Sequence, residues 1–122
     1  MSHAAHQAYA RTAQNTASPR DIEAQALLKA ARMLQDVITR RDESDSGLRA
    51  ALLFNRKLWS IFVTDAVSDA NPEVVGIRQN IANIGIFVLS QCAALLIKPE
   101  VDKLQPLIDI NRNIAAGLSG RG

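Results

Sequence analysis

The sequence predicts an all-α fold, a compact antiparallel bundle of four to five helices. Apolar residues recur at spacings of three and four along several long segments, whereas no segment shows the strict alternation of a strand or a hairpin dipeptide such as Asn-Gly. Short polar or proline-containing connections separate these segments, so neighbouring helices are expected to be antiparallel. With 122 residues the chain has the size of one domain, and we expect a single helical domain over residues 1–122.

The N-terminal part predicts one short helix and one long helix. Residues 4–14 are rich in Ala and polar groups, so residues 1–17 are expected to hold a short first helix or a frayed one. Ser18 is suited to cap the next helix, and Pro19 suits its first position, where the missing N–H costs nothing. We expect this helix to end near residue 40. Its apolar face consists of Leu27, Ala31, Leu34 and Ile38.

The middle of the chain predicts two further helices. After a polar loop at residues 42–47, a third helix is expected over about residues 46–67. Asn71-Pro72-Glu73 predicts the start of a fourth helix, over about residues 72–98. Apolar residues cover most of the circumference of this fourth helix, so its own domain or a partner must cover it on several sides. The single stripe of the third helix is Leu48, Leu52, Asn55, Trp59, Phe62 and Ala66.

A fifth segment begins at Pro99, and Pro106 is expected either to break a helix or to start a new one. The apolar stripe that follows consists of Leu107, Ile110, Ile114 and Leu118. Gly117 and Gly120 are expected to end this helix, which leaves residues 119–122 as a loose tail.

Composition restricts the cellular compartment and the classes of binding partner that we expect for this protein. The net charge of +2 comes with no dense basic face, so no direct contact with nucleic acid is expected. The single cysteine, Cys92, fits a reducing compartment and a buried position. The N-terminus lacks the pattern of a signal peptide. The apolar run of 17 residues at 81–97 is short for a membrane span and contains Asn83, Ser90 and Gln91. We therefore expect a soluble cytoplasmic protein with no membrane span, in which this run is a buried helix.

The chain offers little for catalysis. Its two histidines, His3 and His6, lack neighbouring Cys or acidic residues that would complete a metal site. There is no Gly-rich phosphate loop, nucleophile elbow or zinc-protease motif. We expect no catalytic residue, no metal and no cofactor, and a protein that acts by binding other proteins as a monomer or a weak homo-oligomer.

Two polar constellations interrupt the apolar stripes. Asn55 occupies a stripe position next to Arg56 and four residues before Trp59. It is either an internal amide that bridges two helices or part of an exposed recognition patch, because Trp and Arg are frequent among residues that dominate binding. The second constellation lies in residues 107–114, where Asn111 occupies a helix although Asn is a poor helix former. Its presence implies a specific hydrogen bond, internal or to a partner.

These constellations, together with Ala8-Tyr9 and Ser18-Pro19-Arg20 upstream, resemble the flagellar biosynthesis regulator family FlaF. The order and approximate spacing of an Ala-Tyr segment, a Ser-Pro-Arg opening, an Asn-Arg-x-x-Trp helix and a Leu-Ile-Asp-Ile-Asn-Arg helix agree over nearly the whole chain. One departure concerns the loop after the Trp helix. Family members often carry a Leu-Pro pair after an Asn at this point, whereas this sequence has Asn71-Pro72 directly, followed by Arg78.

The resemblance implies a non-enzymatic role in flagellum assembly, as a flagellin-binding chaperone that couples flagellin export to its synthesis, together with the flagellin-translation regulator FlbT. An alternative is regulation mainly through FlbT or flagellin messenger RNA, without lasting flagellin binding. The surplus apolar helix surface agrees with shielding of a client helix in a groove. The residues predicted to bind a partner are Asn55, Arg56, Trp59, Arg78, Phe87, Ile110, Asn111 and Ile114.

Overall fold

The computed structural model describes residues 18–40 and 45–120, and these form helices joined by short connections. The helices are α2 (Pro19–Thr39), α3 (Asp45–Ala66), α4 (Val75–Ile97) and α5 (Gln105–Gly120), with a 3₁₀ turn η1 (Val101–Lys103) before α5. No strand occurs in this part of the chain, so the all-α prediction is confirmed. The expected first helix, Ala8-Tyr9, His3 and His6 lie outside the described residues.

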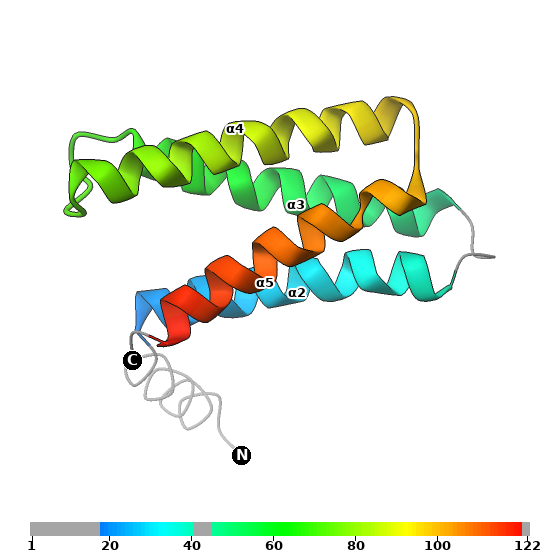
Figure 1. Ribbon diagram of the computed structural model, residues 1–122, viewed down its shortest axis with the longest axis horizontal. Coiled ribbons are helices and arrows are strands. Elements are labelled where there is room, and N and C mark those ends of the chain that lie inside the picture. The colour runs from blue at the N-terminus through cyan, green and yellow to red at the C-terminus, as the bar shows by residue number, and fades with distance from the viewer. Residues whose placement is uncertain (1–17, 41–44, 121–122) are drawn as a thin grey trace, which may run out of the picture.

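Consecutive helices run in opposite directions, and they associate as two pairs (Figure 1). α2 packs closely against α5, α3 packs closely against α4, and contacts between α2 and α3 join the pairs. α4 and α5 follow each other in the chain, yet their backbones do not pack closely. The topology therefore leaves α4 covered mainly by one neighbour, α3.

Local sequence accounts for the start of α2. The Ser18 hydroxyl accepts a hydrogen bond from the backbone N–H of Asp21 at 3.1 Å. The Asp21 carboxylate in turn accepts one from the backbone N–H of Ser18 at 3.4 Å. This capping box satisfies two N–H groups that the helix leaves free, and Pro19 at the first position removes a third. The predicted start of this helix is confirmed.

The core lies where all four helices approach one another, and it is built mainly from Leu and Ala. Trp59 is the largest of its fully buried side chains, and its ring meets the Phe62 ring edge to face, with 5.3 Å between the ring centroids. The other large, fully buried apolar side chains are Leu27, Leu34, Leu52, Val88, Cys92, Leu95, Leu104, Leu107 and Ile108.

Two predicted helix ends are wrong by a few residues. α4 begins at Val75 and not at Pro72, because the Asn71 side chain accepts the backbone N–H of Glu73 at 2.8 Å and holds this stretch as a turn. α5 continues through Gly117 and ends at Gly120, so the expectation that Gly117 ends the helix is wrong. Neither glycine has a positive φ, so neither adopts the left-handed conformation that ends many helices.

The position of α4 also differs from the expectation of a buried central helix. Its inner face packs on α3 so tightly at Gly85 that a Cβ there would overlap a methyl group of Val63 and lie 3.3 Å from the Trp59 ring. On the other side, large apolar residues remain exposed, among them Ile86 at 60% and Ile97 at 86%. The helices of residues 18–40 and 45–120 therefore have more apolar surface than they cover among themselves.

Candidate protein-binding site

The two polar constellations meet in the interior and bond to each other. The Asn111 side chain on α5 accepts a hydrogen bond from the Trp59 indole N–H at 2.8 Å, and its amide N–H donates to the Asn55 side-chain oxygen at 2.6 Å. The Asn55 amide then donates to the Cys92 sulfur of α4 at 3.4 Å. This series of hydrogen bonds, which we call the Asn55–Asn111 network, links α3 to both α5 and α4.

The Asn55–Asn111 network decides between the two interpretations of these asparagines. Asn55, Asn111 and Trp59 are each 0% exposed, so in this structure none of the three is on the surface. A partner could touch them only if α5 left α3. Burial raises the pKa of the Cys92 thiol, which therefore stays protonated and accepts the hydrogen bond as a neutral group. The network is an internal bridge between helices.

By fixing α5 on α3, the network leaves an apolar groove between α4 and α5. The groove has a volume of about 420 Å³ and is lined by residues of these two helices. Its lining is mostly apolar, and each helix adds one exposed asparagine. The lining residues are Ile84, Phe87, Ile110 and Ile114, with Asn83 and Asn113.

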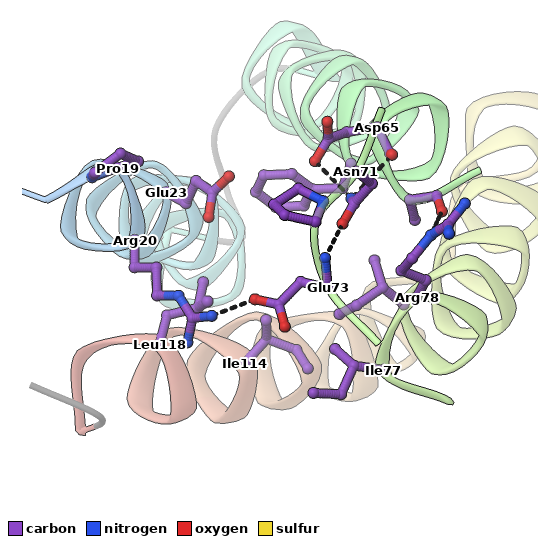
Figure 2. Close-up of a pocket in the computed structure, with 14 residues that line it drawn as sticks. Pro19, Arg20, Glu23, Asp65, Asn71, Glu73, Ile77, Arg78, Ile114 and Leu118 are labelled. Carbon is purple, nitrogen blue, oxygen red and sulfur yellow. Dashed lines mark hydrogen bonds and ion pairs between the residues drawn. The ribbon is translucent and has the colours of Figure 1, made fainter. Parts of the chain in front are cut away.

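A second hollow continues from this groove toward the C-terminal end of α5. It has a volume of about 310 Å³ and lies between the first turn of α2, the end of α3, the start of α4 and the end of α5 (Figure 2). Its apolar lining includes Phe62, Ile77, Ile81 and Leu118. Ile114 lines both hollows, so they adjoin at this residue, and we call the two together the α4–α5 furrow.

Charged groups surround the end of the furrow that lies next to α2. Arg20 of α2 forms an ion pair with Glu73 of the α3–α4 loop, and this contact spans the hollow (Figure 2). The Arg78 guanidinium donates to the backbone carbonyls of Ala66 and Ser68, each at 2.8 Å. Because a cation near the last carbonyls of a helix satisfies free acceptors, Arg78 fixes the end of α3 and the shape of the loop.

Glu23 lines the same end of the furrow, among these charged groups. Burial raises the pKa of its carboxyl group, the negative charges of Asp65 and Glu73 add to the effect, and Arg20 opposes it. The folded state therefore disfavours the ionised form. At a pH below the ordinary pKa of a Glu carboxyl, Glu23 is protonated in both the folded and the unfolded state and costs no stability. The cost develops as the pH rises from that value through the raised pKa of the folded state.

We expect Glu23→Gln to stabilise the protein at pH 7 by roughly a few tenths of a kcal/mol, because solvent screens this partly exposed group. At about pH 4, where the carboxyl is mostly protonated in both states, the gain should disappear. Urea unfolding of the variant and of the wild-type chain at both pH values measures this gain in the free energy of unfolding. Asp102→Asn, which removes an exposed carboxylate outside the furrow, should not reproduce the difference. A gain that is equal at both pH values would contradict this explanation.

The eight residues predicted to bind a partner fall into three groups. Phe87, Ile110, Ile114 and Arg78 line the α4–α5 furrow. Asn55, Trp59 and Asn111 are buried beneath it. Arg56 lies on the exposed side of α3 and lines neither hollow. A role in partner binding stays a prediction for all eight, and direct contact is open only to those on the surface.

The sequence did not single out several residues that line the furrow. The apolar ones, Phe62, Ile77, Ile81, Ile84 and Leu118, occupy helix stripes that indicate a core. The spacing that identifies a stripe is the same whether the stripe meets another helix or borders a hollow. Asn83 and Asn113 are a weak signal of a binding site, because Asn is a poor helix former and is uncommon within helices.

The furrow holds no obvious centre for metal chemistry. Within residues 18–40 and 45–120, no group of three or more His, Cys, Asp or Glu side chains could hold a metal ion. α4 is long and apolar enough to cross a membrane by length and composition, and 22% of its apolar 18-residue segment is buried. Core helices of soluble proteins can have the same length and composition, and the inner face of α4 packs in the core through Val88, Cys92 and Leu95. The absence of a membrane span stays a prediction.

The fold and the furrow together define a small all-α protein in which apolar faces of α4 and α5 stay incompletely covered by the described helices. The chain belongs to the FlaF family, since the family model of the flagellar protein FlaF matches residues 5–118. Membership implies a role in flagellar biogenesis. Comparisons with curated proteins and with solved structures gave no match.

Proposed function

We propose that this protein binds flagellin in the α4–α5 furrow, as a cytoplasmic, non-enzymatic export chaperone that couples flagellin export to flagellin synthesis. The observation that carries the proposal is the open apolar floor between α4 and α5, formed by Ile84, Phe87, Ile110 and Ile114. The family resemblance supplies the client, because flagellin ends in amphipathic helices that find their helical partners only in the filament.

The dimensions and chemistry of the furrow suit a helix. From Ile77 to Phe87 the α4 wall extends about 15 Å, which accommodates roughly three helical turns of a client. An amphipathic helix would place its apolar residues on the floor, while Asn83 and Asn113 could bond to polar side chains at its edges. The furrow is therefore suited to shielding a client helix before export.

Binding of flagellin from the same organism to the purified full-length chain tests the proposal. We expect Phe87→Ala and Ile114→Ala each to weaken the affinity about 10- to 100-fold by calorimetry, because truncation of a central apolar contact removes packing and desolvation together. Ile61→Ala is the matched control, since Ile61 is 56% exposed on α3 and outside the furrow. Thermal unfolding of each variant excludes loss of fold as the cause.

Salt dependence separates the flagellin proposal from the alternative. An apolar furrow should hold flagellin almost equally well at about 50 and 300 mM salt, whereas binding to messenger RNA would weaken steeply over that range. If the wild-type chain retains FlbT or flagellin messenger RNA but no flagellin, the alternative of regulation without flagellin binding takes its place.

A further inference from the structure

The outer face of α4 has the pattern of a helix that pairs with another helix. Residues at successive spacings of three and four along this face are all exposed. We call this set the α4 seam: Gly76, Gln79, Asn83, Ile86, Ser90, Ala93 and Ile97. The mean spacing of 3.5 is that of a coiled-coil contact, in which each helical turn places one residue against the partner helix.

The composition of the α4 seam differs from that of a solvated helix face. None of its residues is ionisable, whereas the exposed side of α3 carries Arg49, Arg56, Lys57 and Asp65. Exposed neighbours Asn80, Phe87 and Ala94 broaden the seam without adding charge. An uncharged exposed face with two large apolar residues near its middle, Ile86 at 60% and Phe87 at 47% exposure, is typical of an interface.

We propose that the α4 seam pairs with the α4 seam of a second copy of this chain, antiparallel, around a two-fold axis at Ile86 and Phe87. In this register Asn83 faces Ser90 of the second copy, so polar side chains meet. Gly76 faces Ile97 of the second copy, so the smallest residue meets a large one. The uncharged seam brings no like charges together, and antiparallel helix dipoles attract.

The register distinguishes this pairing from a parallel one. A parallel seam would place Gly76 against Gly76 and Ile97 against Ile97, leaving a gap at one end and crowding at the other. The contact extends over about three heptads, so the dimer is expected to have a micromolar dissociation constant. It is therefore reversible at the concentrations at which a client could compete.

Dimerisation and client binding share part of one surface. Asn83 and Phe87 belong both to the seam region and to the α4–α5 furrow, so one copy cannot fully engage the client and its own partner together. The second copy covers the exposed face of α4 while no client is bound, and the client displaces it. This competition rests on the proposed function, whereas the dimer itself does not.

Sedimentation equilibrium of the full-length chain from about 1 to 300 µM tests the dimer. We expect the mass to rise from 13.2 kDa toward twice that value. Ile86→Lys should weaken the dimer at least about 100-fold, because two lysines meet at the axis. Ile61→Lys, at an exposed site on α3, should leave it unchanged. Mixing Ile86→Lys with Ile86→Glu should restore the dimer through an ion pair.

Disulfide trapping tests the register. A mixture of Asn83→Cys and Ser90→Cys chains should cross-link to each other under mild oxidation, whereas Asn83→Cys alone should not, since its two copies lie about 10 Å apart along the axis. A monomer at all concentrations, equal effects of the two lysine variants, or cross-linking of Asn83→Cys to itself would overturn the proposal. So would sedimentation of the chain with neutral lipid vesicles that Ile86→Lys abolishes, because a bilayer would then be the occupant.

The experiment separates failure of the dimer from failure of the proposed function. Ile86 and Ile97 do not line the furrow, so a monomeric chain that still binds flagellin overturns only the dimer. A dimer that binds no flagellin overturns only the proposed function. Where both hold, flagellin should shift the wild-type chain from dimer to a complex that contains one copy.

Discussion

Trp59→Ala is expected to lower the free energy of unfolding by about 3–5 kcal/mol, a large share of the stability of a domain this size. Trp59 is 0% exposed and is the largest fully buried side chain. Its removal leaves a cavity beside Phe62 and deprives Asn111 of the indole hydrogen bond of 2.8 Å. The cavity and the lost hydrogen bond both lower the free energy of unfolding.

Urea unfolding followed by far-UV circular dichroism measures this loss, because the variant lacks the only tryptophan and cannot be followed by its fluorescence. Ile61→Ala on the exposed side of the same helix should change stability by less than about 0.5 kcal/mol. A loss below about 1 kcal/mol for Trp59→Ala would mean that the indole is not packed as described. Weakened flagellin binding by this variant would report on folding and not on a lost contact.

Asn111→Leu is expected to cost about 2–4 kcal/mol, although Leu is similar in size and a better helix former. The substitution leaves the Trp59 N–H and the Asn55 side-chain oxygen buried without partners. Each unpaired group costs its full desolvation energy, which the added apolar contact only partly offsets. The buried Asn111 amide therefore stabilises the fold more through the hydrogen bonds of its partners than through the packing of its own atoms.

A double-mutant cycle with Trp59→Phe measures the coupling within the Asn55–Asn111 network. Because Trp59→Phe removes the indole N–H, it should cost about 1 kcal/mol less in the Asn111→Leu background than in the wild-type chain. As a control, Asn113→Leu changes an exposed amide on the same helix and should show no coupling to Trp59→Phe. Additive costs for the first pair would show that the hydrogen bond contributes nothing to stability.

The candidate site was only partly predictable. Asn55 and Asn111 were recognised as anomalies, because each occupies a helix position where an amide needs a specific partner. The sequence does not predict that they bond to each other, because they lie 56 residues apart on two helices whose relative placement depends on tertiary packing. Phe87, Ile110 and Ile114 were predicted as partner-binding residues, and the structure brings them together in one groove.

The helices themselves are a property of the sequence. Spacings of three and four between apolar residues identify each helix and its inner face, and the Ser18-Pro19 signal defines the start of α2 by bonds within one turn. The Asn71-Pro72 signal failed because its bonds involve Asp65 and Glu73, so the turn is held by the end of α3. Local chemistry is sufficient where the partners of a residue are its neighbours in the chain.

Only the tertiary structure decided which helix faces meet and which stay open. The periodicity of α4 and α5 shows that each has an apolar face, but it carries no information on the helix that covers that face. α5 packs on α2 and is fixed to α3 through Asn111, so it cannot also close against α4. The α4–α5 furrow and the α4 seam are open because the packing among the helices that the structure describes leaves them without a partner.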